Sequence, residues 1–248
     1  MSPSNGEYLT LEDVKAHYIP GANSTFGFNK TAIQADDNNL LTEPIVNANI
    51  HLCPTKLISL ENTLGGLIMP LAETKRIVDW AHANNIKVHL DGARIWEVAS
   101  AGAGGLNDYC SLFDSVSLCF SKGLGAPIGS ILVGSKPFIE QARWWRKSIG
   151  GGTRQLGVLS AAARVAVDEV FGSGPNGEGG KLRSTHEKAK KIASEWTNRG
   201  GKLTIPVQTN MVWLNLAGSG VSVNKLFEAA TTRHGLKLSG GRLVIHYR

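Results

Sequence analysis

The sequence contains few cysteines and no long apolar run. Only three cysteines, Cys53, Cys110 and Cys119, occur in 248 residues, with no CxxC pair and no nearby pair of histidines. The odd number of cysteines and the missing pairs indicate neither a disulfide framework nor a structural zinc site. They favour a reducing, cytoplasmic setting. No apolar segment approaches the roughly 18 to 20 residues of a membrane-spanning helix, and the first seven residues do not resemble a signal peptide. We expect no membrane partner.

Charge of either sign is also modest. The chain carries 26 Lys and Arg residues against 20 Asp and Glu residues, a formal net charge of +6. The densest basic clusters, 143–147 and 181–191, lack any zinc-finger or RNA-binding pattern, so nucleic-acid binding is not expected. Hydrophobic residues make up 42% of the chain. This composition and length allow a packed core without metal or disulfide staples, and therefore allow an enzyme.

Most of the chain alternates between strand and helix patterns. Residues 9–19 predict a short helix, and residues 20–49 predict a long loop. Beyond them we expect strands at 56–60, 87–91, 115–120 and 130–133 and helices at 71–84, 95–101, 137–147 and 155–170. Alternation of this kind predicts an α/β domain with a parallel or mixed sheet.

The last third of the chain follows a different pattern. Residues 172–180 contain five glycines and one proline and predict a linker. Beyond it we expect helices at 181–199 and 223–234 and strands at 211–216 and 242–246, which is an α+β arrangement. The predicted organisation is a large α/β domain at 1–171, a linker at 172–180 and a small α+β domain at 181–248.

Lys122 lies just past a predicted strand, in a segment rich in glycine. Gly123, Gly125 and Gly129 let the backbone approach another group closely. A lysine in this position is suited to forming a Schiff base. The alternative is an ordinary surface lysine in a glycine-rich turn.

Asp91 lies at the carboxyl end of another apolar strand. Ligands of open α/β sheets bind at this edge, and an acid there is well placed to pair with the protonated ring nitrogen of a pyridoxal cofactor. The alternative is that Asp91 caps a helix that starts near Arg94.

Several segments together resemble the low-specificity L-threonine aldolases, which are pyridoxal-phosphate enzymes of the aspartate-aminotransferase fold type (fold type I). The matching segments are 89–94, 121–129 and 145–155, with 57–63 and 208–213 in support. The resemblance runs from about Leu9 to the C-terminus. It implies a large fold type I domain with a mixed, mostly parallel sheet, and homotetramers with shared sites. Against the family's motif order, the chain is expected to begin inside the large domain and to stop before the last helix.

The resemblance also implies roles for individual residues. Lys122 would hold pyridoxal phosphate as a Schiff base beside Ser121, and Asp91 would pair with the ring nitrogen. Arg94 and Arg242 would bind the substrate carboxylate, as the planar guanidinium suits. Lys147 and Arg154 would contact the cofactor phosphate, in reach of a neighbouring subunit, and His51 would act on the substrate β-hydroxyl.

Each of these roles has a plainer alternative. Lys147 and Arg154 flank a triple glycine, so they fit a loop with solvated charges, and Arg242 fits a surface ion pair. His51 fits an ordinary loop or core histidine. His89 shares a strand face with Asp91, and we interpret it as structural.

The implied activity is cleavage of L-threonine or L-allo-threonine, a small amino-acid substrate, into glycine and an aldehyde. A related pyridoxal-phosphate racemase acting on alanine would need the same cofactor machinery. A third possibility is a family member that no longer catalyses.

Overall fold

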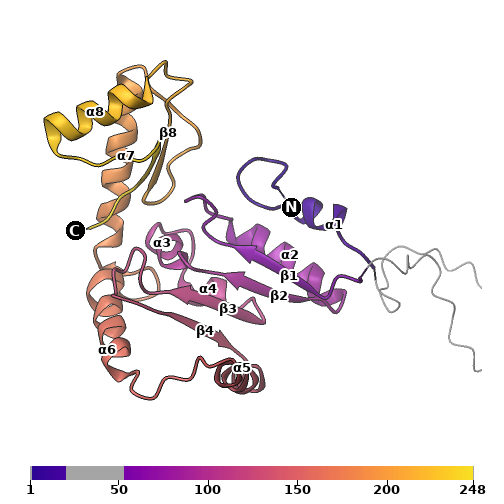
Figure 1. Ribbon diagram of the computed structural model, residues 1–248. Coiled ribbons are helices and arrows are strands. Elements are labelled where there is room, and N and C mark those ends of the chain that lie inside the picture. Colours follow the sequence, from indigo (N-terminus) through magenta and orange to yellow (C-terminus); the bar gives the residue numbers. More distant parts are fainter. Residues whose placement is uncertain (1, 21–52, 248) are drawn as a thin grey trace, which may run out of the picture.

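The computed structural model describes residues 2–20 and 53–247 (Figure 1). The helices are α1 (Leu11–Ala16), α2 (Leu71–Ala83), α3 (Ile95–Ser100), α4 (Leu106–Cys110), α5 (Lys136–Ser148), α6 (Gly157–Ala166), the π-helical turn η1 (Val167–Phe171), α7 (Leu182–Asn198) and α8 (Val223–His234). The strands are β1 (Leu57–Glu61), β2 (Lys87–Asp91), β3 (Ser115–Cys119), β4 (Ser130–Gly134), β5 (Gly172–Ser173), β6 (Glu178–Gly179), β7 (Lys202–Leu203), β8 (Met211–Asn215) and β9 (Arg242–Val244).

The larger sheet has the strand order β1-β2-β3-β4. The first three strands are parallel, and β4 runs antiparallel to β3. Parallel neighbours need a crossover connection, which α2 supplies between β1 and β2, and α3 with α4 between β2 and β3. The predicted α/β class with a mixed, mostly parallel sheet is confirmed.

The core of this part follows from the two sequence periods. In β2, Val88 and Leu90 alternate with more exposed residues and are completely or almost completely buried. In α2, Ile77, Val78 and Ala81 recur at helical spacing and turn toward the same core. The helix stops at the predicted place, since Asn85 adopts a positive φ of 56°.

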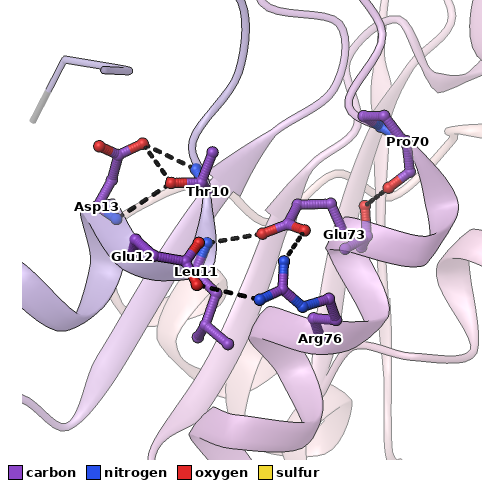
Figure 2. A network of polar contacts seen from close by, with 8 residues as sticks. Thr10, Leu11, Glu12, Asp13, Pro70, Glu73 and Arg76 are labelled. Atoms are coloured by element: carbon purple, nitrogen blue, oxygen red, sulfur yellow. Dashed lines mark hydrogen bonds and ion pairs between the residues drawn. The ribbon is translucent and has the colours of Figure 1, made fainter. Parts of the chain in front are cut away.

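The N-terminal helix α1 is fastened to α2 by a polar network (Figure 2). Thr10 and Asp13 form a capping box at the start of α1. Glu73 of α2 accepts a hydrogen bond from the backbone N–H of Leu11 at 2.7 Å, and Arg76 donates to Glu73 and to Glu12. These contacts bring together segments about sixty residues apart.

A second polar cluster lies just before the start of β3, around Asp114. Asp114 accepts hydrogen bonds from Lys87 Nζ at 2.7 Å, from the backbone N–H of Val88 at 2.8 Å and from His82 Nε2 at 2.9 Å. Burial by itself raises the pKa of Asp114, but these three donors outweigh it and hold the pKa at about 2.

We predict that Asp114→Asn lowers the free energy of unfolding by about 1 kcal/mol near pH 7, a figure reduced for partial exposure to solvent. The folded-state pKa lies below the ordinary value of 3.8. The stabilisation is therefore complete above about pH 4 and is lost as the pH falls toward about 2. Urea unfolding near pH 4 and near pH 2 measures this stabilisation. The control is Asp168→Asn, since Asp168 forms an exposed ion pair with Arg164. A difference between wild type and Asp114→Asn that stays constant with pH would contradict the prediction.

The C-terminal part contains a three-stranded antiparallel sheet in the order β7-β8-β9. Ala189 and Ala193 of α7 pack with Val212 of β8 in a small separate core. Figure 1 shows α7 running from beside the larger sheet up to this smaller one. The two parts also meet where Thr209 Oγ1 donates to the carbonyl oxygen of Gly66 at 2.8 Å. The arrangement matches the predicted α+β pattern, while the domain boundaries stay a prediction.

Several local predictions need correction. Residues 172–180, predicted as a linker, contain the hairpin β5-β6, because glycines at positive φ, such as Gly174 and Gly177, allow tight turns; their role as a linker stays a prediction. The helix predicted at 155–170 ends earlier and continues as η1. The short elements α4 and β7 were not predicted. Most of the loop predicted at 20–49 lies outside the described residues.

Strand β4 and helix α5 carry unusually exposed apolar side chains. Ile131 and Leu132 of β4 are 44% and 40% exposed, and α5 buries no residue. Within the described residues β4 pairs only with β3, so its other edge is open. No helix in the described ranges is both long and apolar enough to cross a membrane.

Candidate active site

The three parallel strands end at one edge of the sheet, and two of the residues predicted for the cofactor site, Asp91 and Lys122, lie there. Asp91, the last residue of β2, is in register with Glu61 of β1 and with Ser117 of β3. Lys122 follows the end of β3 at Cys119. Chain segments that leave the carboxyl ends of parallel strands form the ligand-binding crevice of open α/β sheets. The structure therefore brings Asp91 and Lys122 to the expected edge.

The loop that carries Lys122 is closed by backbone hydrogen bonds. The N–H of Phe120 donates to the carbonyl oxygen of Gly129 at 3.0 Å, and the N–H of Ala126 donates to that of Phe120 at 3.0 Å. The N–H of Gly125 donates to the carbonyl oxygen of Lys122 itself at 2.9 Å. Gly125 has a φ of 69°, which a side chain would strain. Lys122 is thus half-buried in a defined loop, which we call the lysine loop (120–129).

The C-terminal strand segment covers one side of the lysine loop. Tyr247 donates its hydroxyl to the carbonyl oxygen of Leu124 at 3.4 Å. A Cβ atom on Gly125 would lie 2.7 Å from that hydroxyl and 3.2 Å from the ring of His246. Glycine is therefore required at position 125 for packing as well as for its φ angle.

The charges at the sheet edge interact with one another. Loss of hydration raises the pKa of Glu61 most, and the neighbouring charge of Asp91 raises it further. The positive charges of Lys122 and Arg94 act in the opposite direction on the same carboxyl group. The charges of Asp91, Lys122 and Arg94 all act on the carboxyl group of Glu61. These three side chains therefore lie in one electrostatic environment.

Arg94 and Arg242 come from distant parts of the chain but lie close enough to repel each other. Burial lowers the pKa of Arg94 most, and the charge of Arg242 lowers it further, against the opposite influence of Glu97 and Glu61. The Arg242 guanidinium lies over the Trp213 ring, 5.6 Å from its centroid. Two neighbouring guanidinium groups form a ready site for an anion such as a carboxylate.

Two of the plainer alternatives can now be judged. Asp91 does not cap α3, because the N-cap of that helix is Arg94, which makes no side-chain capping bond. Asp91 Oδ1 instead accepts a hydrogen bond from the N–H of Ala93 at 3.0 Å. Arg242 forms no ion pair with any carboxylate in the described part of the chain. His89 bonds to Ser115 Oγ at 2.8 Å, which agrees with its structural interpretation.

Lys147 and Arg154 have no contact with this edge among the described residues. Helix α5 begins after β4, beside the start of β3. It therefore begins at the end of the sheet opposite to the carboxyl ends of the parallel strands. Lys147 at its far end and Arg154 beyond it are exposed, and no hydrogen bond or ion pair among the described residues links them to Lys122. Ser121 is exposed next to Lys122, and His51 lies outside the described residues.

Glu61 is the member of this site that sequence reasoning did not assign. The available signal was its position, because it ends β1 as Asp91 ends β2. An acid at the end of each of two adjacent parallel strands predicts that the two carboxylates meet at the same edge.

The fold is fold type I, the fold of the pyridoxal-phosphate-dependent enzymes among its solved structural neighbours. The structure is similar to a threonine aldolase from Leishmania major, with a TM-score of 0.59 at 17% identity, covering 82% of this chain and 59% of that one. A variant of serine palmitoyltransferase from S. paucimobilis with bound pyridoxal phosphate and myriocin gives a TM-score of 0.56 at 20% identity, covering 79% and 50%.

The chain belongs to the β-eliminating lyase family, whose sequence profile matches residues 5–219. It is 48% identical to an aldolase from Penicillium aethiopicum and 43% identical to an alanine racemase from Cochliobolus carbonum, each over 100% of this chain. It is 42% identical to a low-specificity L-threonine aldolase from Candida albicans over 99% of this chain. The chain spans 55% to 57% of the length of these relatives.

Proposed function

We propose that this chain carries out, or forms part of a protein that carries out, cleavage of L-threonine or L-allo-threonine into glycine and an aldehyde with pyridoxal phosphate as cofactor. The observation that supports it most is the placement of Asp91 at the end of β2 and of Lys122 just after the adjacent parallel strand β3, at the same carboxyl edge of the sheet. The family and its threonine aldolase members support the same reaction class.

The side chains at this edge fit the cofactor by their chemistry. An amine, a carboxylate and guanidinium groups are the three kinds of group that a pyridoxal cofactor and an amino-acid substrate require. When bound, pyridoxal phosphate supplies an electron sink for the electron pair released at Cα. The half-buried Lys122 offers the amine, in a loop whose glycines leave room for close approach.

Lys122 and Asp91 divide the work on the cofactor. Lys122 would hold the cofactor covalently through Nζ. Asp91, at the end of β2, would pair with the ring nitrogen and favour its protonated form. Arg94 and Arg242 would bind the substrate carboxylate. This role accounts for two neighbouring cations of which Arg242 has no carboxylate partner within the described residues.

Proton transfer from the substrate β-hydroxyl is assigned to His51, since histidine as a residue type titrates near neutral pH. Lys147 and Arg154 are assigned to the cofactor phosphate. Their exposure on and after α5, away from Lys122, is consistent with service to the site of a neighbouring copy in a homotetramer.

A racemase acting on alanine is the second candidate, because one relative with that name is 43% identical over the whole chain. The same side chains would serve both reactions. What differs is which bond at Cα is held perpendicular to the cofactor ring.

The products distinguish the two reactions. The chain is incubated with pyridoxal phosphate and either L-threonine or L-alanine, with Lys122→Ala as control. We expect acetaldehyde and glycine from L-threonine, and no D-alanine from L-alanine. D-alanine without acetaldehyde would favour the racemase, and neither product, together with no covalent attachment of the cofactor, would favour a non-catalytic family member.

A further inference from the structure

A buried acid–histidine pair lies directly beneath the lysine loop. Glu97 of α3 is 1% exposed and His186 of α7 is 3% exposed. Glu97 Oε2 and His186 Nε2 are 2.6 Å apart, so one proton is shared in a hydrogen bond between them. The two residues are 89 positions apart in sequence, and they join helices α3 and α7, which pack against each other. Neither side chain has a role in the proposed cleavage reaction.

The second oxygen of Glu97 points to the lysine loop. Oε1 is buried and has no hydrogen-bond partner among the described residues. A Cβ atom on Gly123 would overlap this oxygen, and it would also lie 3.4 Å from Leu182 of α7. The carboxylate is therefore packed against the backbone of the residue that follows Lys122. Any side chain at position 123 would displace either the loop or Glu97.

Stability alone does not explain a carboxylate at this place. A buried acid with one unpaired oxygen carries a desolvation penalty that its single partner does not fully offset, and an apolar side chain of similar volume would fill the space without it. A side chain that costs stability and touches a functional loop is a candidate for a positioning role.

Glu97 also connects the lysine loop to the substrate side of the edge. Helix α3 begins directly after its N-cap Arg94, and the charge of Glu97 acts on that guanidinium. The same short helix thus carries Arg94 at its start and, one turn later, the carboxylate that underlies Gly123.

We propose that Glu97, held by His186, is a positioning residue that fixes the height and orientation of the lysine loop and so places Lys122 relative to Asp91 and Arg94. The proposal rests on the proposed function, because it takes Lys122 as the lysine that binds the cofactor. It adds that α7, which leads to the C-terminal sheet, supports the loop through His186.

The test compares Glu97→Ala, His186→Ala and the isosteric Glu97→Gln with a matched control, Val98→Ala. Val98 is fully buried in the same helix, so its truncation destabilises the core without removing the contact with Gly123. Two quantities are measured for each variant: amide hydrogen exchange of the peptide covering 121–126, and the affinity for covalently attached pyridoxal phosphate from its absorption.

We expect Glu97→Ala and His186→Ala to speed exchange in residues 121–126 about tenfold and to weaken cofactor attachment by a similar factor. Glu97→Gln, which keeps the shape and a hydrogen bond to His186, should remain within about threefold of wild type. Val98→Ala should lower the melting temperature but change neither quantity in this segment.

Equal acceleration of exchange at 121–126 in Glu97→Ala and Val98→Ala would overturn the proposal, because it would show a general loss of stability. Unchanged exchange in Glu97→Ala would overturn it as well. If wild type does not attach the cofactor, the proposed function fails, while the exchange comparison still decides whether Glu97 positions the loop.

Discussion

Lys122→Ala is expected to abolish covalent attachment of pyridoxal phosphate and to reduce threonine cleavage by at least about 10³-fold. The reason is chemical. Among the described residues, Lys122 is the lysine whose charge acts on Glu61 at the end of β1. Without this amine, only non-covalent contacts would hold the cofactor.

The matched control for this variant is Lys136→Ala. Lys136 is exposed at the start of α5, and its Nζ lies 3.9 Å from Glu140 Oε1. Circular dichroism and thermal unfolding should show both variants folded as wild type. Retained cleavage in Lys122→Ala, or equal loss in both variants, would contradict the assignment.

Asp91→Asn is expected to lower kcat for threonine cleavage by about 10²- to 10³-fold while covalent attachment to Lys122 persists. An amide of the same shape keeps the contact with the N–H of Ala93 but carries no charge to hold a proton on the cofactor ring nitrogen. A loss of kcat with cofactor attachment retained would indicate an electronic role of Asp91. A loss of both would indicate a structural role.

Asp79→Asn provides the comparison for Asp91→Asn. Asp79 lies on the exposed face of α2, paired with Lys75, and takes no part in the strand-end site. The Asp79→Asn variant should have the same kcat as wild type. If Asp91→Asn stayed within about threefold of wild type in kcat, or if it lost the cofactor altogether, Asp91 would not have the proposed role.

The positions of Asp91 and Lys122 could be predicted because local patterns determine them. Strand alternation identifies β2 and β3, and the residue type at each strand end indicates the chemistry. Parallel pairing then brings the ends together without further information. Arg94 and Arg242 were predicted only through resemblance to a family, since no local pattern relates two residues so distant in sequence.

Contacts made by tertiary packing could not be predicted in this way. The bond between Glu97 and His186 depends on how α3 and α7 meet, which neither helix encodes alone. The hairpin at 172–180 was missed because a glycine-rich composition indicates flexibility, whereas here the glycines supply the positive φ angles of a tight turn. Helix α4, with only five residues, is too short for its periodicity to be recognised.

The central claim is that Lys122 is the cofactor-binding lysine at the carboxyl edge of the sheet. The most direct measurement is to mix the chain with pyridoxal phosphate, reduce it with borohydride and locate the modified lysine by peptide mass spectrometry. We predict a single phosphopyridoxyl group on Lys122, in a yield approaching one per chain. Modification spread over exposed lysines such as Lys136 and Lys225, with Lys122 unlabelled, would contradict the account.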